Sequence, residues 1–325
     1  MSLYAIWSNY QPLVREELTM SLYGMMKGKG SNGLGYTTTA EQVTKGIDLT
    51  GNTFLLTGCN SGIGLETLRV LAMRGGHVLA VARTVEKAQA AIDRSGATGT
   101  ALACDLAEPV SVRECIAAVK VLGRPLNGMI CNAGIMALPK LQQKHGYEMQ
   151  FFTNHIGHFI LVTGLLEQLA GEGRVVMVAS AAHHSAPDKG IQFDNLDGSH
   201  GYSPWANYGQ SKLANILFAR HLAKKLSGKG QTANAIHPGV IHTNLTRHMN
   251  PAMRIIMPLI GPLALKSIGQ GAATQCYVAT HPDLAGISGE YFRDCGKVFS
   301  SRLGQDLELA ERLWNRSEEI VAQVG

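Results

Sequence analysis

Residues 53–64 read Thr-Phe-Leu-Leu-Thr-Gly-Cys-Asn-Ser-Gly-Ile-Gly, an apolar run that passes directly into a loop with three glycines. A segment of helical length follows this loop. Glycines let a backbone turn tightly and approach a pyrophosphate, and the amino terminus of the next helix attracts its negative charge. The spacing is G-x-x-x-G-x-G instead of the commoner G-x-G-x-x-G, so an ordinary turn is the alternative. The strand–loop–helix context favours a phosphate-binding loop.

The rest of the chain repeats the alternation of apolar run and helix. The apolar runs with strand character cover residues 53–57, 77–82, 100–104, 128–131, 174–179, 232–236 and 289–292. Continuous apolar strands separated by helices are typical of a parallel sheet that is covered on both faces. We therefore predict an α/β fold, a doubly wound parallel sheet (Rossmann fold) of about seven strands. Its ligand crevice is expected at the switch point of the sheet.

The domain organisation follows from where this alternation begins. Residues 1–50 contain glycines at 24, 28, 30, 33 and 35 and show no strong period, so we predict an N-terminal extension that wraps the domain or stays partly mobile. Residues 51–325 are predicted to form a single domain. A final helix is expected near residues 305–321, where Leu307, Ala310, Trp314 and Val321 recur at helical spacing for packing.

Composition excludes several classes of protein. Of the 325 residues 45% are hydrophobic and 16% charged, and the net charge of +5 comes from scattered basic residues, which argues against a nucleic-acid partner. The six cysteines form no C-x-x-C pair, so free thiols and a reducing compartment are expected. No signal peptide or 18-residue apolar run is found, because the most hydrophobic stretch, residues 255–265, is short and contains Pro258, Gly261 and Pro262. We expect a cytoplasmic protein, with peripheral contact with a membrane left open.

The second predicted strand indicates which dinucleotide binds. A carboxylate at its end would bind the ribose 2′-hydroxyl of NAD, whereas a basic residue accommodates the 2′-phosphate of NADP. Residues 77–82 are followed by Arg83 and Thr84, without an acidic residue, and a guanidinium can pair with a phosphate through its planar fork. NADP(H) is favoured, and a solvated loop arginine is the alternative.

A tyrosine and a lysine provide the candidate chemistry. Tyr208-Gly-Gln-Ser-Lys212 opens a helical segment, and the i, i+4 spacing places both side chains on one face. A free phenol has a pKa of about 10, and a neighbouring cation is expected to lower that value. The Y-x-x-x-K pattern alone is common by chance, so it needs support from other residues.

Several motifs together supply that support. Besides the loop 57–64 and Y-x-x-x-K, the chain has Asn132-Ala133-Gly134 after the fourth strand, Asn154 within Thr-Asn-His, Ser180 after the fifth strand, and His237-Pro238-Gly239-Val240 with Thr243 after the sixth. With these motifs the chain resembles a classical short-chain dehydrogenase/reductase from about Thr38 to its end. Within that family the likeness is greatest to the subgroup of the retinol dehydrogenases, the WW-domain oxidoreductase and the plastid translocon dehydrogenase.

The resemblance implies a role for each motif. Tyr208 would exchange a proton with the reacting oxygen as hydride moves, Ser180 would stabilise that oxygen, Lys212 would hold the nicotinamide ribose, and Asn154 would anchor a relay water. These four are the predicted catalytic residues. Asp105, after the third strand, is expected to face the adenine, and the alternative for it and for the Asn132–Gly134 segment is turn chemistry. The expected cofactor contacts are Gly58, Asn60, Ser61, Gly62, Ile63, Gly64, Arg83, Thr84, Asp105, Leu106, Asn132, Ala133, Gly134, Tyr208, Lys212, Pro238, Gly239, Val240 and Thr243.

A histidine pair, His183 and His184, invites a metal-site interpretation. Adjacent residues point in different directions and no third ligand lies at a usable spacing, so no metal is expected.

The segment after the sixth strand suggests the substrate. Residues 240–267 contain methionines and branched aliphatics that could form an adaptable apolar wall, namely Leu245, Met249, Met253, Ile255, Ile256, Met257, Leu259 and Ile260. A lipophilic small molecule, such as a retinoid, steroid, terpenoid or long-chain aldehyde, is the expected partner. Packing in a homodimer or contact with a membrane surface are alternatives.

Two other functions remain open at this point. One is an NADP(H)-loaded sensing protein without turnover, whose signature would be an incomplete set of catalytic residues. The other is a reductase of an activated C=C bond.

Overall fold

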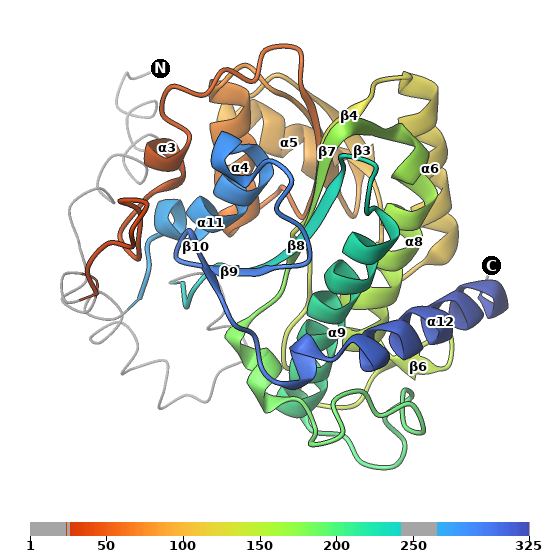
Figure 1. The fold of residues 1–325 in the computed structure, drawn as a ribbon. Helices are drawn as coiled ribbons and strands as arrows, with labels where there is room; N and C mark the ends of the chain where they lie inside the picture. Colours follow the sequence, from red (N-terminus) through yellow and green to blue (C-terminus); the bar gives the residue numbers. More distant parts are fainter. Residues whose placement is uncertain (1–23, 25–26, 242–264, 325) are drawn as a thin grey trace, which may run out of the picture.

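The computed structural model describes residue 24 and residues 27–241 and 265–324 (Figure 1). One eight-stranded sheet forms the centre of the molecule, with the strand order β10-β9-β8-β7-β4-β1-β2-β3. The strands are β1 (Thr53–Thr57), β2 (His77–Ala82), β3 (Gly99–Ala103), β4 (Leu126–Cys131), β7 (Leu169–Val178), β8 (Thr232–His237), β9 (Tyr291–Arg293) and β10 (Gly296–Val298). The order runs outward from β1 in one direction and from β4 in the other. The predicted doubly wound sheet is thus confirmed, and its switch point lies between β1 and β4.

Burial explains why the sequence forms these strands. Every residue of β1 and β8 is buried, as expected for parallel strands that are covered on both faces. Strands β1 and β2 have the predicted bounds. Strand β3 begins and ends one residue earlier than predicted, whereas β7 begins at Leu169 instead of residue 174.

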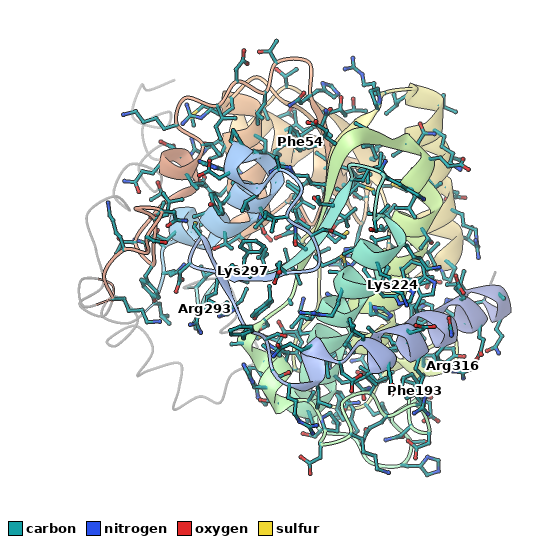
Figure 2. The ribbon with its side chains drawn as sticks, viewed as in Figure 1. Phe54, Phe193, Lys224, Arg293, Lys297 and Arg316 are labelled. Carbon is teal, nitrogen blue, oxygen red and sulfur yellow. The ribbon has the colours of Figure 1, made fainter. Side chains whose placement is uncertain are left out.

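The edge of the sheet differs from the prediction of about seven strands. The seventh predicted run begins too early in the sequence, because Gly289 precedes β9. An eighth strand, β10, pairs antiparallel with β9. The turn between these strands places Asp294 and Cys295 in the left-handed region, at φ 54° and 59°. Nothing in the short polar sequence of β10 signals a strand. Across this hairpin Lys297 pairs with Glu290 at 2.8 Å, and Figure 2 shows Lys297 and Arg293 together there.

Two layers of helices cover the sheet. One face carries α3 (Ala40–Val43), α4 (Gly62–Met73), α5 (Val85–Ser95) and α11 (Ile268–Thr280), which share one apolar core. The opposite face carries α6 (Pro109–Leu122), α8 (Gly157–Leu165), α9 (Pro204–Lys225) and α12 (Leu307–Gln323), which share the other. Phe54 of β1 belongs to the first core and lies within the sheet layer in Figure 2.

Short elements connect these layers. A two-stranded ladder, β5 (Gln143–Lys144) and β6 (Tyr147–Glu148), leads into α7 (Met149–Phe151) and the π-helical turn η2 (Phe152–Ile156). The 3-10 turns are η3 (Leu166–Gln168), η4 (Ala181–Ser185), η6 (Pro282–Leu284) and η7 (Leu303–Gln305). Among the helices of the described ranges, none has both the length and the apolar character that a membrane span requires.

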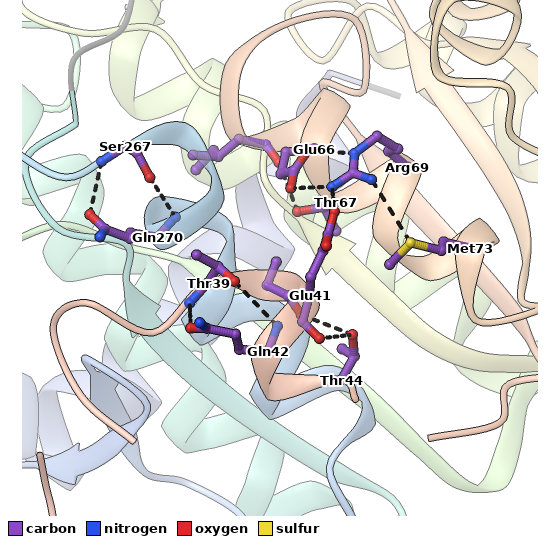
Figure 3. Close-up of polar contacts among 12 residues, drawn as sticks. Thr39, Glu41, Gln42, Thr44, Glu66, Thr67, Arg69, Met73, Ser267 and Gln270 are labelled. Carbon is purple, nitrogen blue, oxygen red and sulfur yellow. Dashed lines mark hydrogen bonds and ion pairs between the residues drawn. The ribbon is translucent and has the colours of Figure 1, made fainter. Parts of the chain in front are cut away.

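The described part of residues 27–50 packs on α4 and α11. Thr39 and Gln42 form a capping box at the start of α3, and Ser267 and Gln270 form a second one at the start of α11 (Figure 3). Arg69 of α4 pairs with Glu41 of α3. These contacts fix α3 against the face of the sheet that carries α4.

Helix α12 packs through a different set of residues than predicted. Ala310 and Trp314 are buried as expected, with Leu313 and Ile320, but Leu307 is 61% exposed at the first turn. Trp314 stacks on Phe218 of α9 at a centroid distance of 5.5 Å. On the outer side of the helix Arg316 pairs with Glu319 at 2.7 Å, beside Phe193 (Figure 2). The six cysteines are all free and buried.

Candidate active site

The glycine loop lies at the carboxyl end of β1, next to the switch point of the sheet. Gly58 has a φ of +70°, which glycine adopts without strain. A side chain on Gly64 would collide with the Gly58 carbonyl oxygen, at 2.1 Å, so the loop needs both glycines. Ser61 caps α4 without a side-chain hydrogen bond, which leaves the first backbone N–H groups of the helix available to an anion.

The residues predicted to contact the 2′ position of the cofactor ribose lie just beyond β2. Arg83 and Thr84 directly follow β2 and are exposed. Within the described part of the chain Arg83 has no hydrogen-bond or ion-pair partner. The Thr84 hydroxyl accepts from Lys87 N at 3.4 Å and so caps α5. Arg94 donates to the carbonyl oxygen of Asn60 at 2.8 Å, which ties α5 to the glycine loop.

Asp105 and Leu106 follow β3 in a tight turn. One Asp105 carboxylate oxygen accepts from Ala107 N at 3.0 Å, so part of the predicted adenine contact already serves the turn. Leu106 is buried, and its carbonyl oxygen would meet a side chain on Gly157 at 2.2 Å. This close approach brings the turn against the helix that carries Asn154.

The Asn132–Ala133–Gly134 segment is held against the glycine loop by Thr57. The Thr57 hydroxyl accepts from the backbone N–H groups of Asn132 and Ala133, both at 3.0 Å. The Asn132 amide donates to the Thr57 carbonyl at 2.8 Å, whereas its side-chain oxygen is buried and has no partner in the described part of the chain. The sequence predicted Thr57 only as part of the loop motif and did not indicate that it joins the two loops.

The Tyr208 and Lys212 side chains lie one turn apart near the start of α9. Lys212 Nζ is 5.7 Å from the centroid of the Tyr208 ring and donates to the carbonyl of Val178, at the end of β7, at 2.9 Å. Ser180, two residues beyond that strand, lies beside the Tyr208 phenol, close enough to affect its pKa. The exposed indole of Trp205 meets the Tyr208 ring edge-on, at a centroid distance of 6.1 Å.

Asn154 joins this group from the π-helical turn η2. Its side-chain oxygen accepts from Ile135 N at 2.8 Å, and its amide donates to the Ile135 carbonyl and to the Ser211 hydroxyl, each at 2.9 Å. Ser211 in turn donates to the Tyr208 carbonyl at 2.8 Å. Asn154, Ser180, Tyr208 and Lys212 are therefore brought together although they come from three different parts of the chain.

The segment after β8 is described only at its two ends. Gly239 has a φ of +95° and packs on the aliphatic part of Lys266, where a side chain would come within 2.6 Å. Lys266 is buried and pairs with Asp294 at 2.6 Å. Pro238 and Val240 lie on this turn, whereas Thr243 and the predicted apolar wall from Leu245 to Ile260 lie outside the described residues.

Comparison with known proteins agrees with this geometry. The sequence profile of the family described as "short chain dehydrogenase" matches residues 52–254. The chain belongs to the short-chain dehydrogenase family. It is thus an oxidoreductase of a family that uses NAD(P)(H).

Individual relatives cover nearly the whole chain. The chain is 43% identical to the short-chain dehydrogenase TIC 32 B, chloroplastic, of Brassica napus, over 93% of this chain and 99% of the relative. It is 38% identical to retinol dehydrogenase 12 of Mus musculus, over 86% and 89% of the two chains. A crystal structure of a short chain dehydrogenase from Burkholderia cenocepacia in complex with NADP superposes with a TM-score of 0.61 at 25% identity, over 75% and 96%.

In this short-chain dehydrogenase the pKa values of the central pair differ from the prediction. Burial raises the pKa of Tyr208 to about 12, and the hydrogen bond with Ser180 opposes that shift only in part. Burial also lowers the pKa of Lys212 to about 8. The predicted net lowering of the phenol pKa is therefore wrong, because desolvation of the buried phenolate outweighs any effect of the neighbouring ammonium.

Two buried histidines hold the backbone around Ser180. His183 Nδ1 donates to the Ser180 carbonyl at 2.6 Å, and its Nε2 accepts from Ser301 N at 3.0 Å. His237 Nδ1 accepts from Ala181 N at 3.2 Å. Burial lowers the pKa of both imidazoles to about 4, so they are neutral at physiological pH. No pattern in the sequence predicts these contacts, beyond the histidines themselves.

The residues present fit a nicotinamide dinucleotide. The start of α4 has no side-chain cap from Ser61, so its first backbone N–H groups suit a pyrophosphate. Among the described residues Arg83 has no partner at the end of β2, where a 2′-phosphate would lie. The predicted catalytic residues are therefore bonded within the fold, whereas the predicted phosphate-binding residues leave polar groups open.

Proposed function

We propose that the protein is an NADP(H)-dependent oxidoreductase that interconverts an alcohol and a carbonyl on a lipophilic substrate. The observation that carries the proposal is the contact of the Tyr208 and Ser180 side chains, one helical turn from Lys212, beside the glycine loop. A hydroxyl pair of this kind can hold one substrate oxygen and exchange one proton with it. The nicotinamide supplies or accepts the hydride when it is bound.

Each catalytic side chain has a distinct task in this proposal. Tyr208 donates a proton to the substrate oxygen or accepts one from it, and Ser180 donates a hydrogen bond to the same oxygen as negative charge develops. Lys212 is already oriented by the Val178 carbonyl and holds the ribose. Asn154, fixed by Ile135 and Ser211, keeps the helix that carries it aligned with the start of α9.

The pKa of the phenol favours reduction of the carbonyl at neutral pH. With a pKa of about 12, Tyr208 is protonated and able to donate. Oxidation of an alcohol needs the phenolate, so its rate should rise with pH across the alkaline range. The rate of reduction should change little between about pH 6 and 8, because the phenol stays protonated there.

Arg83 supports the choice of NADP(H). It follows β2 directly, it is exposed, and no acidic side chain occupies that strand end. A guanidinium can form a bidentate, charge-assisted pair with a phosphate. A 2′-hydroxyl offers no such pair.

A lipophilic substrate is supported by two features beside the reacting group. Trp205 is 49% exposed and lies against the Tyr208 ring, where it can form one apolar wall. The sequence of residues 240–267 supplies methionines and branched aliphatics on the chain that leaves β8. A relative by sequence, retinol dehydrogenase 12, is named for an apolar alcohol. Contact of the same segment with a membrane surface or a second copy of the chain is the alternative.

The test is turnover with lipophilic aldehydes. Purified protein is mixed with NADPH and, separately, decanal, an aromatic aldehyde or retinal, and loss of nicotinamide absorbance is followed. We expect oxidation of NADPH and formation of the matching alcohol. NADPH binding without turnover of any carbonyl would favour a sensing protein, and a saturated carbonyl product would indicate reduction of a C=C bond.

A further inference from the structure

We propose that His158 is a positioning residue that connects the backbone of Asn154 to the cofactor loops through the Thr57 hydroxyl. The proposal deepens the function proposed above and rests on it for its kinetic consequence. Its structural content is independent, because it concerns the hydrogen-bonded state of one buried imidazole.

Both ring nitrogens of His158 have a partner. Nδ1 lies 3.0 Å from the carbonyl oxygen of Asn154, one helical turn earlier in the chain. Nε2 lies 2.9 Å from the Thr57 hydroxyl at the end of β1, 101 residues away. The imidazole is 0% exposed, so no water takes part in these contacts from the surface.

The chemistry of the partners fixes where the protons are. A carbonyl oxygen only accepts, so His158 Nδ1 carries the hydrogen and Nε2 has the lone pair. Thr57 must therefore donate its single hydroxyl hydrogen to Nε2. The hydroxyl oxygen accepts from Asn132 N and Ala133 N, at 3.0 Å each, which uses both of its lone pairs. Only one placement of the hydrogens satisfies every donor and acceptor in this series of contacts.

This arrangement requires a neutral imidazole. A proton on Nε2 would face the Thr57 oxygen, whose lone pairs are already used. Burial lowers the pKa of His158 to about 4, and the Lys212 ammonium contributes in the same direction. Within the described ranges, the imidazole of His155 also interacts with His158, and it is itself buried and neutral.

The two ends of the connection serve different parts of the site. At one end, Asn154 carries the side chain that bonds Ile135 and Ser211, next to Tyr208. At the other end, Thr57 sets the backbone of Asn132 and Ala133 against Gly58. Loss of the Nδ1 contact should therefore reduce kcat, and loss of the Nε2 contact should weaken NADPH binding.

His155 provides a matched control from the same helical turn. It is 1% exposed, and its Nε2 bonds the Ser317 hydroxyl of α12 at 2.8 Å, away from the catalytic side chains. Replacing His155 removes an equally buried imidazole from the core. A general effect of core damage should therefore appear in His155→Leu as well as in His158→Leu.

The first experiment detects the tautomer directly. Protein labelled with ¹⁵N at histidine is observed by two-bond ¹H–¹⁵N correlation between pH 7 and about pH 5, above the pKa of about 4. We expect His158, assigned by its loss in His158→Gln, to give the Nδ1–H tautomer throughout. An Nε2–H tautomer or an imidazolium in this range would overturn the proposal. This measurement needs neither substrate nor cofactor.

The second experiment separates the two contacts by substitution. His158→Asn places an amide N–H near the Nδ1 position and keeps the bond to Asn154, whereas His158→Gln places an oxygen near the Nε2 position and keeps the acceptor for Thr57. We expect His158→Asn to retain kcat and to bind NADPH several-fold more weakly. We expect His158→Gln to retain the NADPH Kd and to lose about 10–100-fold in kcat, the scale of a misplaced catalytic group.

The readouts are the NADPH Kd from nicotinamide fluorescence, kcat and KM with decanal, and Tm. His155→Leu should lower Tm and leave Kd and kcat near the parental values. If His158→Asn, His158→Gln and His158→Leu all kept the parental Kd and kcat, His158 would contribute only to core packing, and the proposal would be overturned. Failure of the proposed function is seen separately, as no turnover by the unmodified protein, and the Kd and tautomer arms still decide the role of His158.

Discussion

The predicted catalytic part of the site and the predicted phosphate-binding edge differ in how their polar groups are satisfied. Asn154 is 0% exposed and Lys212 is 4% exposed, and both are bonded to backbone groups of other segments. At the edge, Arg83 is exposed and without a partner among the described residues, and the first turn of α4 lacks a side-chain cap. The polar groups of the first part are bonded within the fold, whereas those of the second part are available to a ligand.

The difference has a physical cause. Groups that act on a reacting bond must be held in one geometry, because a small misplacement costs much of the rate. Groups that bind phosphates gain affinity from charge and need to be accessible before the ligand arrives. Mutations in the two parts should therefore fail in different ways, and four predictions test this, in order of decreasing expected effect.

Tyr208→Phe should have the largest effect. It removes one buried oxygen from the catalytic part and keeps the ring packing, so kcat should fall about 10²–10⁴-fold while the NADPH Kd stays near parental. Tyr147→Phe is the matched control, because Tyr147 is also 9% exposed and its hydroxyl bonds Gln323 in α12. Parental kcat for Tyr208→Phe would remove the catalytic assignment and favour the sensing protein.

The second-largest effect is expected from acid, which should destabilise the folded protein through its buried histidines. The pKa of His155 is about 3 and those of His158, His183 and His237 are about 4, all below the value of about 6.5 in the unfolded chain. The unfolded state therefore binds more protons below about pH 6.5, so stability is complete above that pH and is lost as the pH falls toward 4.

Each such histidine can cost about 1.4 kcal/mol for every pH unit below its unfolded pKa. Tm should therefore drop by about 5 °C or more between about pH 7 and 5, before most carboxylates titrate. Scanning calorimetry measures this. A constant Tm over this interval would show that the stability of the folded protein does not depend on these imidazoles being neutral.

Arg83→Ala tests the exposed edge. Loss of a charge-assisted pair should raise the KM for NADPH about tenfold or more, which corresponds to about 1.4 kcal/mol, and leave NADH and Tm nearly unchanged. The exposed Arg113 in α6 controls for net charge. If the unmodified protein used both cofactors equally, Arg83 would be only a solvated residue.

Thr84→Ala should have the smallest effect. Its hydroxyl caps α5 through Lys87 N, so the change should cost about 1 kcal/mol of stability. The KM for NADPH should change only a few-fold, because the backbone at the edge remains. Thr84→Ser, which keeps the hydroxyl, should restore Tm, and Tm equal to the parental value in Thr84→Ala would show that the cap contributes nothing.

Local patterns predicted the scaffold well. The bounds of β1 and β2 and the doubly wound order followed from apolar runs, and Tyr208 and Lys212 share a helix, so their proximity follows from helical spacing alone. Strand β10 was missed because its sequence is short and polar, and it depends on the Asp294–Cys295 turn. Leu307 was wrongly expected to be buried, because helical period does not show where a helix first meets its neighbour.

The sequence by itself determined the fold, the family resemblance and the residue types that meet at the end of the sheet. Only the tertiary structure decided their electrostatics and their connections. The pKa of Tyr208 rises because neighbours far apart in the chain exclude water from it, which no i, i+4 spacing can reveal. The same holds for Thr57 and His158, which are 101 residues apart and meet because parallel strands and their helices bring distant segments to one edge.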